Sequence, residues 1–385
     1  MLPRFIAEIP LSLYIHMPWC VRKCPYCDFN SHELAAGQLS QDLEQQYIDA
    51  LIADFATQMD FIQGRELHSI FIGGGTPSLI SAPAYQRLFD ALKSHIPFQE
   101  NCEITMEANP GTVEHDPFED YLRVGINRLS IGVQSFDEAH LQRLGRIHNP
   151  DNAKSAIQNA KSAGFKRINV DLMHGLPQQT IAQALDDLQI AIDCGATHIS
   201  WYQLTIEPNT VFYRSQLTLP DEEVLEQIQL QGETLLRAHG FINYEVSAWA
   251  KERPSQHNLN YWQFGDYLAI GAGAHGKVTL PDGIYRFQKT RMPKDYLEQV
   301  PAQKLQFKMI ADEDMPFEFM MNALRLNAGV PSDFYLARTG QDLSTIQPVL
   351  EELRQKHLLD QNIEQLKCTE QGRLFLNTVL QGFLS

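Results

Sequence analysis

Three of the six cysteines in the chain lie within eight residues, and this grouping constrains the fold more than any other feature. Cys20, Cys24 and Cys27 are spaced C-x3-C-x2-C. Thiolates held this close together favour a thiophilic metal centre, typically iron–sulfur or zinc. A closed structural zinc site needs four ligands, so three thiolates favour an iron–sulfur cluster with one iron left open. A zinc site completed by His16 or His32 remains the alternative.

The composition is that of a folded protein with no cationic character. Of 385 residues, 44% are hydrophobic and 20% charged, which is enough for a large core and two or three domains. The formal net charge of -16 argues against nucleic acid as a partner, because phosphate binding needs clustered cations. No stretch approaches the length of a transmembrane helix, so we expect at most peripheral membrane association.

The other cysteines indicate the compartment. Cys102, Cys194 and Cys368 are isolated in the sequence, which is unlike a disulfide framework. We therefore expect a reducing, cytoplasmic location, which also suits an iron–sulfur cluster.

Strand-like and helix-like segments alternate from the cysteine motif to about residue 206. The strand-like segments are residues 11–17, 69–72, 103–107, 128–133, 167–172 and 198–205. Six βα units in a row predict an α/β fold with a parallel sheet and outer helices, as an open or partial barrel. Glycine, carboxylate and amide residues follow these strands, at the rim where barrel active sites are built. We therefore expect the motifs to form one site.

The pattern changes after Asp221. Residues 1–220 are expected to form the barrel domain, and residues 221–310 a linking region that contains the loop-rich stretch 256–276. Residues 311–385 are expected to form a small, mostly helical C-terminal domain. This tail lacks a basic recognition face, which favours a structural or partner-docking role over DNA binding.

The cysteine spacing, with Tyr26 directly before the last cysteine, resembles the signature of the radical S-adenosylmethionine (radical SAM) superfamily. The run from Tyr14 to Cys20 is similar to the branch that contains oxygen-independent coproporphyrinogen III oxidase and related heme chaperones. The resemblance implies a (βα)6 partial barrel of the TIM type, a winged-helix-like C-terminal domain and a [4Fe-4S] cluster on the three cysteines. In this superfamily the open iron chelates the amino and carboxylate groups of SAM, and an electron from the cluster splits SAM to a 5'-deoxyadenosyl radical.

The resemblance also implies a SAM site at the strand ends. Gly74, Gly75 and Thr76 follow the second strand, and glycines there let the backbone approach a ligand and leave its N–H groups for anionic oxygens. Glu107 ends the third strand, where the family contacts SAM with a glutamate. A tight βα turn and a turn cap are the structural alternatives for these two elements.

Five further residues match SAM contacts of the family. Tyr14 and Tyr26 correspond to aromatic contacts near the cluster, with core packing as the alternative. Gln134, Arg146 and Asp171 correspond to positions that hold a second SAM molecule in the oxidase. Arg146 is suited to pair bidentately with a carboxylate. Asp171 stands in an apolar strand, where an unpaired charge is costly, so a structural ion pair is its alternative.

A second candidate site is the segment from His257 to Trp262, which reads His-Asn-Leu-Asn-Tyr-Trp. Histidine is a common heme ligand, although a loop histidine is ordinarily only a surface residue. The pattern His-Asn-x-x-Tyr-Trp resembles a segment typical of the heme chaperones, which implies that His257 binds heme. His275, in the glycine-rich stretch 271–276, is a lesser ligand candidate.

Two features separate this chain from the oxidase. The oxidase has a further cysteine where this chain has Phe29, and it has a longer N-terminal extension. The resemblance therefore implies a heme chaperone that binds heme and delivers it to heme-requiring apoproteins such as respiratory enzymes. The alternatives are SAM-dependent oxidative decarboxylation of coproporphyrinogen III and a zinc-stabilised, non-catalytic scaffold. An oligomer is compatible with each of these functions.

Overall fold

The computed structural model describes residues 9–35, 37–111, 115–300 and 306–384. Its centre is a 12-stranded sheet in the order β14-β13-β12-β11-β1-β4-β5-β6-β7-β8-β10-β9. Six consecutive parallel strands form the middle of this sheet: β1 (Leu11–Met17), β4 (Leu67–Gly74), β5 (Phe98–Ala108), β6 (Arg128–Gln134), β7 (Arg167–His174) and β8 (His198–Gln203). They are the six strands predicted from the sequence. Because β8 pairs with β7 and β10 rather than with β1, the barrel is partial, as expected.

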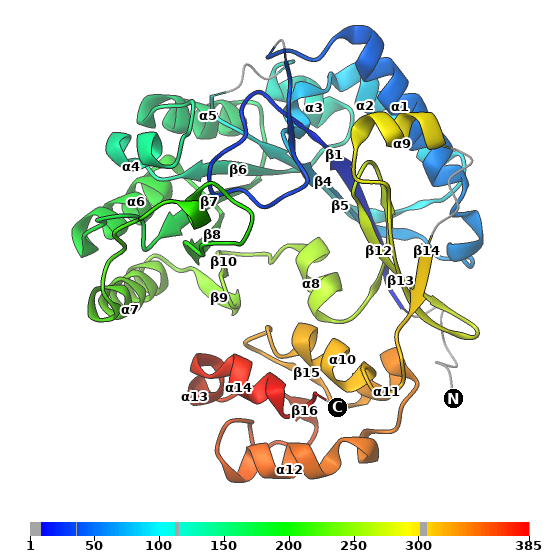
Figure 1. The fold of residues 1–385 in the computed structure, drawn as a ribbon, viewed down its shortest axis with the longest axis vertical. Coiled ribbons are helices and arrows are strands. Elements are labelled where there is room, and N and C mark those ends of the chain that lie inside the picture. Colours follow the sequence, from blue (N-terminus) through cyan, green and yellow to red (C-terminus); the bar gives the residue numbers. More distant parts are fainter. Residues whose placement is uncertain (1–8, 36, 112–114, 301–305, 385) are drawn as a thin grey trace.

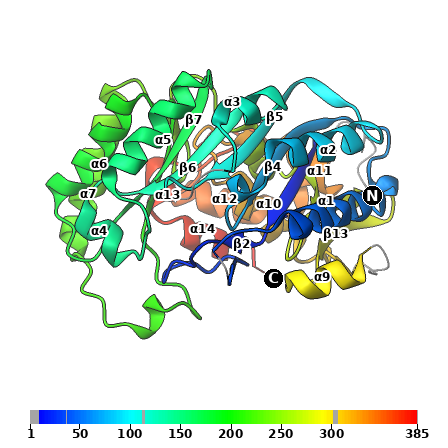
Figure 2. The same ribbon diagram turned by 90° about the horizontal axis from the view of Figure 1, so that it is seen from above.

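Helices cover the outer side of the strands, and seen from above α1, α2, α3, α5 and α6 follow one another in chain order (Figure 2). The helices of this layer are α1 (Gln41–Ala56), α2 (Ala82–Lys93), α3 (Phe118–Arg123), α4 (Glu138–Arg143), α5 (Pro150–Ser162), α6 (Ile181–Cys194) and α7 (Glu222–Ala238). The side chains of Ser40, Ser81, Asn149 and Thr180 accept N–H groups in the first turns of α1, α2, α5 and α6. These caps satisfy donors that a helix start leaves free.

Residues 221–310 extend the sheet at both edges, so the expectation of a linking region is wrong. On one side the antiparallel strands are β10 (Ala248–Ala250) and β9 (Ile242–Glu245). On the other side are β11 (Asp266–Ile270), which is parallel to β1, and then antiparallel β12 (His275–Leu280), β13 (Gly283–Gln288) and β14 (Gln306–Met309), with α9 (Pro293–Gln299) before β14. These strands are short or rich in glycine, and tertiary pairing overrides their weak local pattern.

The stretch 256–276, expected to be rich in loops, begins with a helix. This helix is α8 (Gln256–Trp262), and the Ser255 side chain caps it by accepting the Asn258 N–H group. It packs against β4, β1 and β11, and Figure 1 shows it between the sheet and helix α10 (Met315–Ala323).

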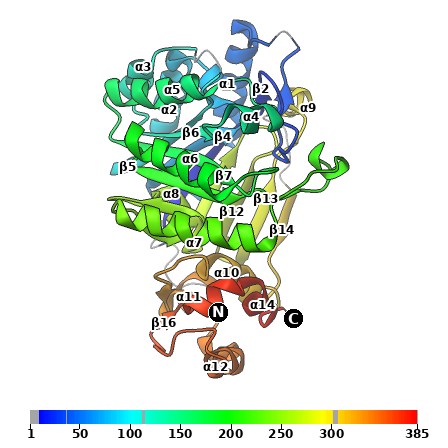
Figure 3. The ribbon, with the colours of Figure 1, turned by 90° about the vertical axis from the view of Figure 1, so that its left-hand side faces the viewer.

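The C-terminal domain is mostly helical, as predicted. Besides α10 it contains α11 (Asp333–Thr339), α12 (Gln347–Gln355), α13 (Glu370–Leu374), α14 (Leu376–Gln381) and a small sheet of β15 (Val330–Pro331) and β16 (Gln365–Leu366). Its core includes Phe319, Tyr335 and Leu350 and continues to Tyr244 and Phe264 of the barrel side. Figure 3 shows these helices gathered at one end of the molecule.

Some residues of the predicted domains lie outside the described parts of the chain. They are residues 1–8, 36, 112–114, 301–305 and 385. Within the described parts, no helix combines the length and the apolar character needed to cross a membrane.

A buried ion cluster joins the added strands to the barrel. Asp266, the first residue of β11, is paired with Arg65 at 2.8 Å and with Lys277 of β12 at 2.9 Å. Burial acts to raise the pKa of Asp266, but the charges of Lys277 and Arg65 outweigh it and hold this pKa below its usual range. The carboxylate therefore stays ionised and ties β11, β12 and the chain before β4 together.

We expect Asp266→Ala to lower the free energy of unfolding by about 3–5 kcal/mol, because it leaves two buried cations unpaired. Urea denaturation followed by circular dichroism would measure this change. The matched control is Glu352→Ala, which breaks an exposed Lys356–Glu352 pair and should cost about 1 kcal/mol or less. Equal losses in the two variants would contradict a structural role for the buried cluster.

Candidate functional site

The cysteine loop lies at the end of β1 and is held by its own hydrogen bonds. It runs between two short paired strands, β2 (Trp19–Cys20) and β3 (His32–Glu33). The Lys23 ammonium donates to the carbonyl oxygens of Phe29 at 3.0 Å and Ser31 at 3.1 Å. The Cys27 N–H group donates to the Cys24 carbonyl at 3.1 Å, which closes a turn between two of the cysteines. These hydrogen bonds and the pairing of β2 with β3 fix the course of the loop.

The three thiols are of the ligand type that binds an iron–sulfur cluster. Each is half-buried, and all three are free cysteines. Burial raises the pKa of Cys20 to about 11; the neighbouring Cys27 and Cys24 add to the rise, whereas a hydrogen bond with Thr76 opposes it. The negative charges of neighbouring thiolates repel one another, so each thiol resists ionisation. Bound iron cations would offset this repulsion and stabilise the thiolates.

The alternative of a zinc site completed by His16 or His32 is weakened, because His16 is not available as a ligand. Within the described residues, no three histidine, cysteine, aspartate or glutamate side chains are arranged to hold a metal ion. Both ring nitrogens of His16 are engaged, Nδ1 with the Tyr14 hydroxyl at 2.8 Å and Nε2 with the Asn30 carbonyl at 2.9 Å. His16 is therefore not free to complete a zinc site in this structure.

The glycine loop after β4 packs directly against the cysteine loop. A Cβ at Gly74, where φ is +116°, would lie 2.6 Å from the His16 ring, and one at Gly75 would lie 2.3 Å from the Trp19 carbonyl oxygen. The Gly75 N–H group donates to the Met17 carbonyl at 2.6 Å, and the Thr76 N–H group to the Trp19 carbonyl at 2.7 Å. Glycine is needed here for close approach of two backbones.

The expectation that these N–H groups are free for a ligand is wrong. Gly74 also uses its N–H group inside the protein, as a donor to Glu107 Oε2 at 3.0 Å. The loop can offer a ligand its surface, but its three amides are already bonded.

Two carboxyl groups on nearby strands of the sheet are half-buried, Glu107 at the end of β5 and Asp171 on β7. Burial raises the pKa of Glu107 to about 8, the charge of Asp171 adds to the rise, and the Gly74 N–H group opposes it. Burial also raises the pKa of Asp171, although Asn169 Nδ2 at 2.8 Å and Ser130 Oγ at 3.1 Å donate to it. Asp171 thus has hydrogen-bond partners, and Glu107 is the carboxyl group kept neutral at pH 7.

The remaining predicted residues lie around this pair. Gln134 ends β6 at φ +70°, beside a bulge in the β6–β7 pairing, and its Oε1 accepts the Tyr202 hydroxyl at 2.8 Å. Tyr26 packs on Phe212 with ring centroids 6.1 Å apart. Tyr14 is tied to His16 as described above. A non-glycine residue at positive φ is strained, and such strain is common at functional sites.

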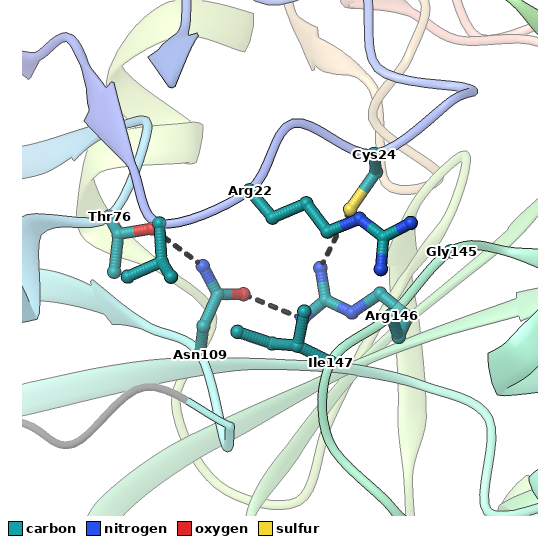
Figure 4. Close-up of a pocket in the computed structure, with 8 residues that line it drawn as sticks. Arg22, Cys24, Thr76, Asn109, Gly145, Arg146 and Ile147 are labelled. Carbon is teal, nitrogen blue, oxygen red and sulfur yellow. Dashed lines mark hydrogen bonds between the residues drawn. The ribbon is translucent and has the colours of Figure 1, made fainter. Parts of the chain in front are cut away.

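A small pocket beside Cys24 contains a residue that the sequence reasoning missed. The pocket holds about 280 Å³ of space, part of it open to solvent, and is lined by Val21, Arg22, Cys24, Thr76, Asn109, Gly145, Arg146 and Ile147. Figure 4 shows Asn109 between Thr76 and Arg146, bonded to both. The available signal was its place two residues after Glu107, at the same strand end.

The structure places His257 far from this rim. It contacts Ser69, the third residue of β4, whereas Gly74 at the rim is the last. Five residues of strand span about 16 Å at the usual rise of about 3.3 Å per residue. His257 belongs to α8, which fills the opposite end of the barrel.

Both ring nitrogens of His257 are hydrogen-bonded in this structure, so its role as a heme ligand stays a prediction that would require one of these bonds to break. Its side chain is enclosed, with the residue 1% exposed. Nδ1 is bonded to Ser69 Oγ at 2.9 Å and Nε2 to the Tyr261 hydroxyl at 2.8 Å, and burial lowers the His257 pKa to about 3. The neutral imidazole is a packing and hydrogen-bonding element of α8.

Comparison with known proteins agrees with this architecture. The Radical SAM superfamily profile matches residues 14–191, and the HemN C-terminal domain profile matches residues 310–375. Curated proteins named heme chaperone HemW from Escherichia coli (strain K12) and from Haemophilus influenzae are each 51% identical over 378 residues, which is 98% of this chain and 98% of theirs. The chain belongs to the HemW family. A HemW from Bacillus subtilis (strain 168) is 33% identical and covers 97% of this chain and 99% of its own.

The fold also has a counterpart among solved structures. The coproporphyrinogen III oxidase HemN from Escherichia coli matches with a TM-score of 0.81 at 23% identity, over 98% of this chain and 90% of that one. The match confirms the predicted radical SAM fold with its C-terminal domain. At this identity it says nothing of activity.

The raised pKa of Glu107 predicts how stability depends on pH. The folded protein binds this proton more tightly than the unfolded chain does, so the free energy of unfolding should fall as pH rises from about 5 to about 8. Glu107→Gln removes the ionisable proton but keeps an oxygen for the Gly74 N–H group. We therefore expect this variant to be more stable than the wild type at pH 8.5, by on the order of a few kcal/mol, and nearly equal to it at pH 5.

Urea denaturation at the two pH values would measure the difference. Glu66→Gln, at an exposed position, is the matched control and should follow the wild type. If Glu107→Gln also followed the wild type at both pH values, the carboxyl group would have to be ionised at neutral pH.

Proposed function

We propose that this protein is a heme chaperone, which binds heme and delivers it to heme-requiring apoproteins. The observation that carries the proposal is the 51% identity to two heme chaperones HemW over 98% of each chain. Identity of this extent covers the barrel, the cysteine loop and the C-terminal domain together. Phe29 stands where the resemblance places an additional cysteine in the oxidase, which argues against coproporphyrinogen decarboxylation.

Cys20, Cys24 and Cys27 are the proposed ligands of a [4Fe-4S] cluster. The superfamily match and the half-buried thiols support this assignment. When bound, the cluster would supply an open iron for the amino and carboxylate groups of SAM and an electron for its cleavage. The chain's own part is to position the sulfurs and to shield them.

Residues at the rim are proposed to bind SAM next to the cluster. Gly74, Gly75 and Thr76 would form the surface on which the amino acid part of SAM lies. Glu107 would accept a hydrogen bond from the SAM amino group, and since its pKa is raised to about 8, the positive charge of SAM would favour its ionised form. Tyr14 is proposed as an aromatic wall of the same site.

Tyr26, Gln134 and Asp171 are proposed for further SAM contacts in the barrel. Gln134 and Asp171 retain polar atoms at buried positions, and each is held in place by a hydroxyl donor. Fixed polar groups of this kind bind a ligand with little reorganisation.

We propose a cytoplasmic location and heme-requiring apoproteins, such as respiratory enzymes, as recipients. The net charge of -16 opposes a direct attraction to anionic lipid. Contact with a membrane-bound recipient would therefore be peripheral, through the recipient itself.

We propose His275 as a heme ligand in place of His257. His275 is exposed at the start of β12, and no hydrogen bond holds its ring in the described structure. It follows Gly273, where a Cβ would lie 2.2 Å from the Asn30 side chain, so it stands next to the cysteine loop. An exposed imidazole without a partner suits an iron ligand better than an enclosed one.

Exposed apolar and cationic side chains on the neighbouring segments could contact the porphyrin ring and its propionates. Asn30 Nδ2 donates to the Ala272 carbonyl at 3.0 Å and to the Arg291 carbonyl at 2.8 Å, which brings the two segments beside the cysteine loop. Phe29, next to Asn30, is 63% exposed, and Met292, next to Arg291, is 51% exposed. Apolar surface suits the porphyrin plane, and the exposed Arg291 suits a propionate.

An anaerobic heme titration of the reconstituted wild type tests the function. We expect saturable binding near one heme per chain, followed by the Soret absorbance, and no conversion of coproporphyrinogen III in the same preparation with SAM and a reductant. Conversion without stable heme binding would replace the chaperone by the oxidase.

Substitution of the two histidines tests the ligand. We expect His275→Ala to weaken heme binding about tenfold or more and to shift the Soret band, because an iron ligand is lost. His257→Ala should bind heme as the wild type does but lose about 1–3 kcal/mol of stability, since it removes the partner of the buried Tyr261 hydroxyl and one of the two partners of Ser69. His239→Ala, at an exposed position on the end of α7, is the control. A folded His257→Ala that binds no heme would reverse the assignment.

A further inference from the structure

The guanidinium of Arg146 connects the cysteine loop to the ends of strands β5 and β6. Nη1 donates to Cys24 Sγ at 3.5 Å. Nη2 donates to Asn109 Oδ1 at 2.7 Å and to the Gly132 carbonyl at 2.6 Å. An arginine side chain stays protonated in proteins, so this group is a cation. Both terminal nitrogens take part in these contacts, and the SAM contact expected of Arg146 from the sequence stays a prediction.

Asn109 fixes the direction in which Arg146 points. Its Oδ1 accepts from Arg146 while its Nδ2 donates to Thr76 Oγ1 at 3.0 Å. A Cβ at Gly132 would lie 3.1 Å from Asn109 Oδ1 and 3.7 Å from Arg146 Nη2, so the strand leaves just enough room for this arrangement. Figure 4 shows the chain of contacts from Thr76 through Asn109 and Arg146 to Cys24.

The arrangement reaches two of the three cysteines. Thr76, at one end, lies close enough to Cys20 to lower the pKa of its thiol, and Arg146, at the other, donates to Cys24. Cys27 has a different neighbour, Ser31 Oγ at 3.6 Å from its sulfur. Arg146 is the only one of these three donors that carries a positive charge.

We propose that Arg146, oriented by Asn109, raises the reduction potential of the cluster through Cys24. The inference rests on the proposed [4Fe-4S] cluster. Reduction adds one negative charge, and hydrogen bonds to the ligand sulfurs are among the factors that set cluster potentials. A cation at Cys24 Sγ stabilises the more negative, reduced state more than the oxidised one. Arg146 is thus a positioning and tuning residue, and Asn109 acts through it.

The experiment is a redox titration of the reconstituted full-length protein without SAM, followed by the electron paramagnetic resonance signal of the reduced cluster. We expect Arg146→Gln to shift the midpoint potential to a more negative value. A tenfold fall in the ratio of reduced to oxidised cluster at fixed potential corresponds to 59 mV for one electron. Arg146→Lys keeps the charge and should recover part of the shift. Asn109→Ala keeps Arg146 but removes the hydrogen bond that orients its side chain, so we expect a smaller shift of the same sign.

Arg143→Gln is the matched control. It removes the same charge three residues away, but Arg143 donates to the Pro177 carbonyl and to Gln178 Oε1, both at 2.8 Å, and not to a cysteine. Its midpoint potential should equal that of the wild type. An equal shift in Arg143→Gln would mean that the loss of any positive charge near the site explains the effect. No shift in cluster-loaded Arg146→Gln would overturn the inference.

Iron and sulfide analysis separates this inference from the function on which it rests. A wild type that takes up no cluster would contradict the proposed cofactor. A wild type and variants with equal iron and sulfide but equal potentials would contradict only the role of Arg146. If Arg146→Gln fails to fold, Asn109→Ala and Arg146→Lys still decide the sign of the shift.

Discussion

The close approach of the ends of β1 and β4 is the contact on which the site depends. Gly74 lies against the His16 ring and Gly75 against the Trp19 carbonyl, at distances that exclude any side chain. Two backbone hydrogen bonds, from Gly75 to Met17 and from Thr76 to Trp19, fix the same junction. Because the cysteine loop starts at Trp19, the position of the thiols follows from how two parallel strands end.

The two ends of the barrel use buried charge in different ways. At the far end Glu103 is paired with Arg167 at 2.6 Å and accepts the His257 N–H group of α8, which stabilises the packing of α8 against the sheet. At the rim Glu107 has a backbone donor but no described cation beside it, and its pKa is raised. A carboxyl group that burial keeps neutral can be ionised by a cationic ligand, so Glu107 at the rim is suited to binding. Glu103, which is already paired with a cation at the far end, is suited to stability.

The sequence predicted the six parallel strands closely, because each is a short apolar run followed by a turn and a helix. It failed for α8 and β11, where local periodicity is weak and pairing with β1 and β4 creates the structure. Site residues that stand at the ends of predicted strands, such as Glu107, could be identified from the sequence. Asn109 was missed because an asparagine before a proline is read locally as a turn residue.

The sequence by itself determined the kind of chemistry: the spacing of Cys20, Cys24 and Cys27 sets the ligand type, and the order of the strands sets the rim. Only the tertiary structure decided how single side chains are used. Arg146 meets Cys24 across 122 positions of the chain, and His257 meets Ser69 across 188. Periodicity and spacing are local properties, whereas burial and hydrogen-bond partners are set by residues that folding brings together from distant parts of the chain.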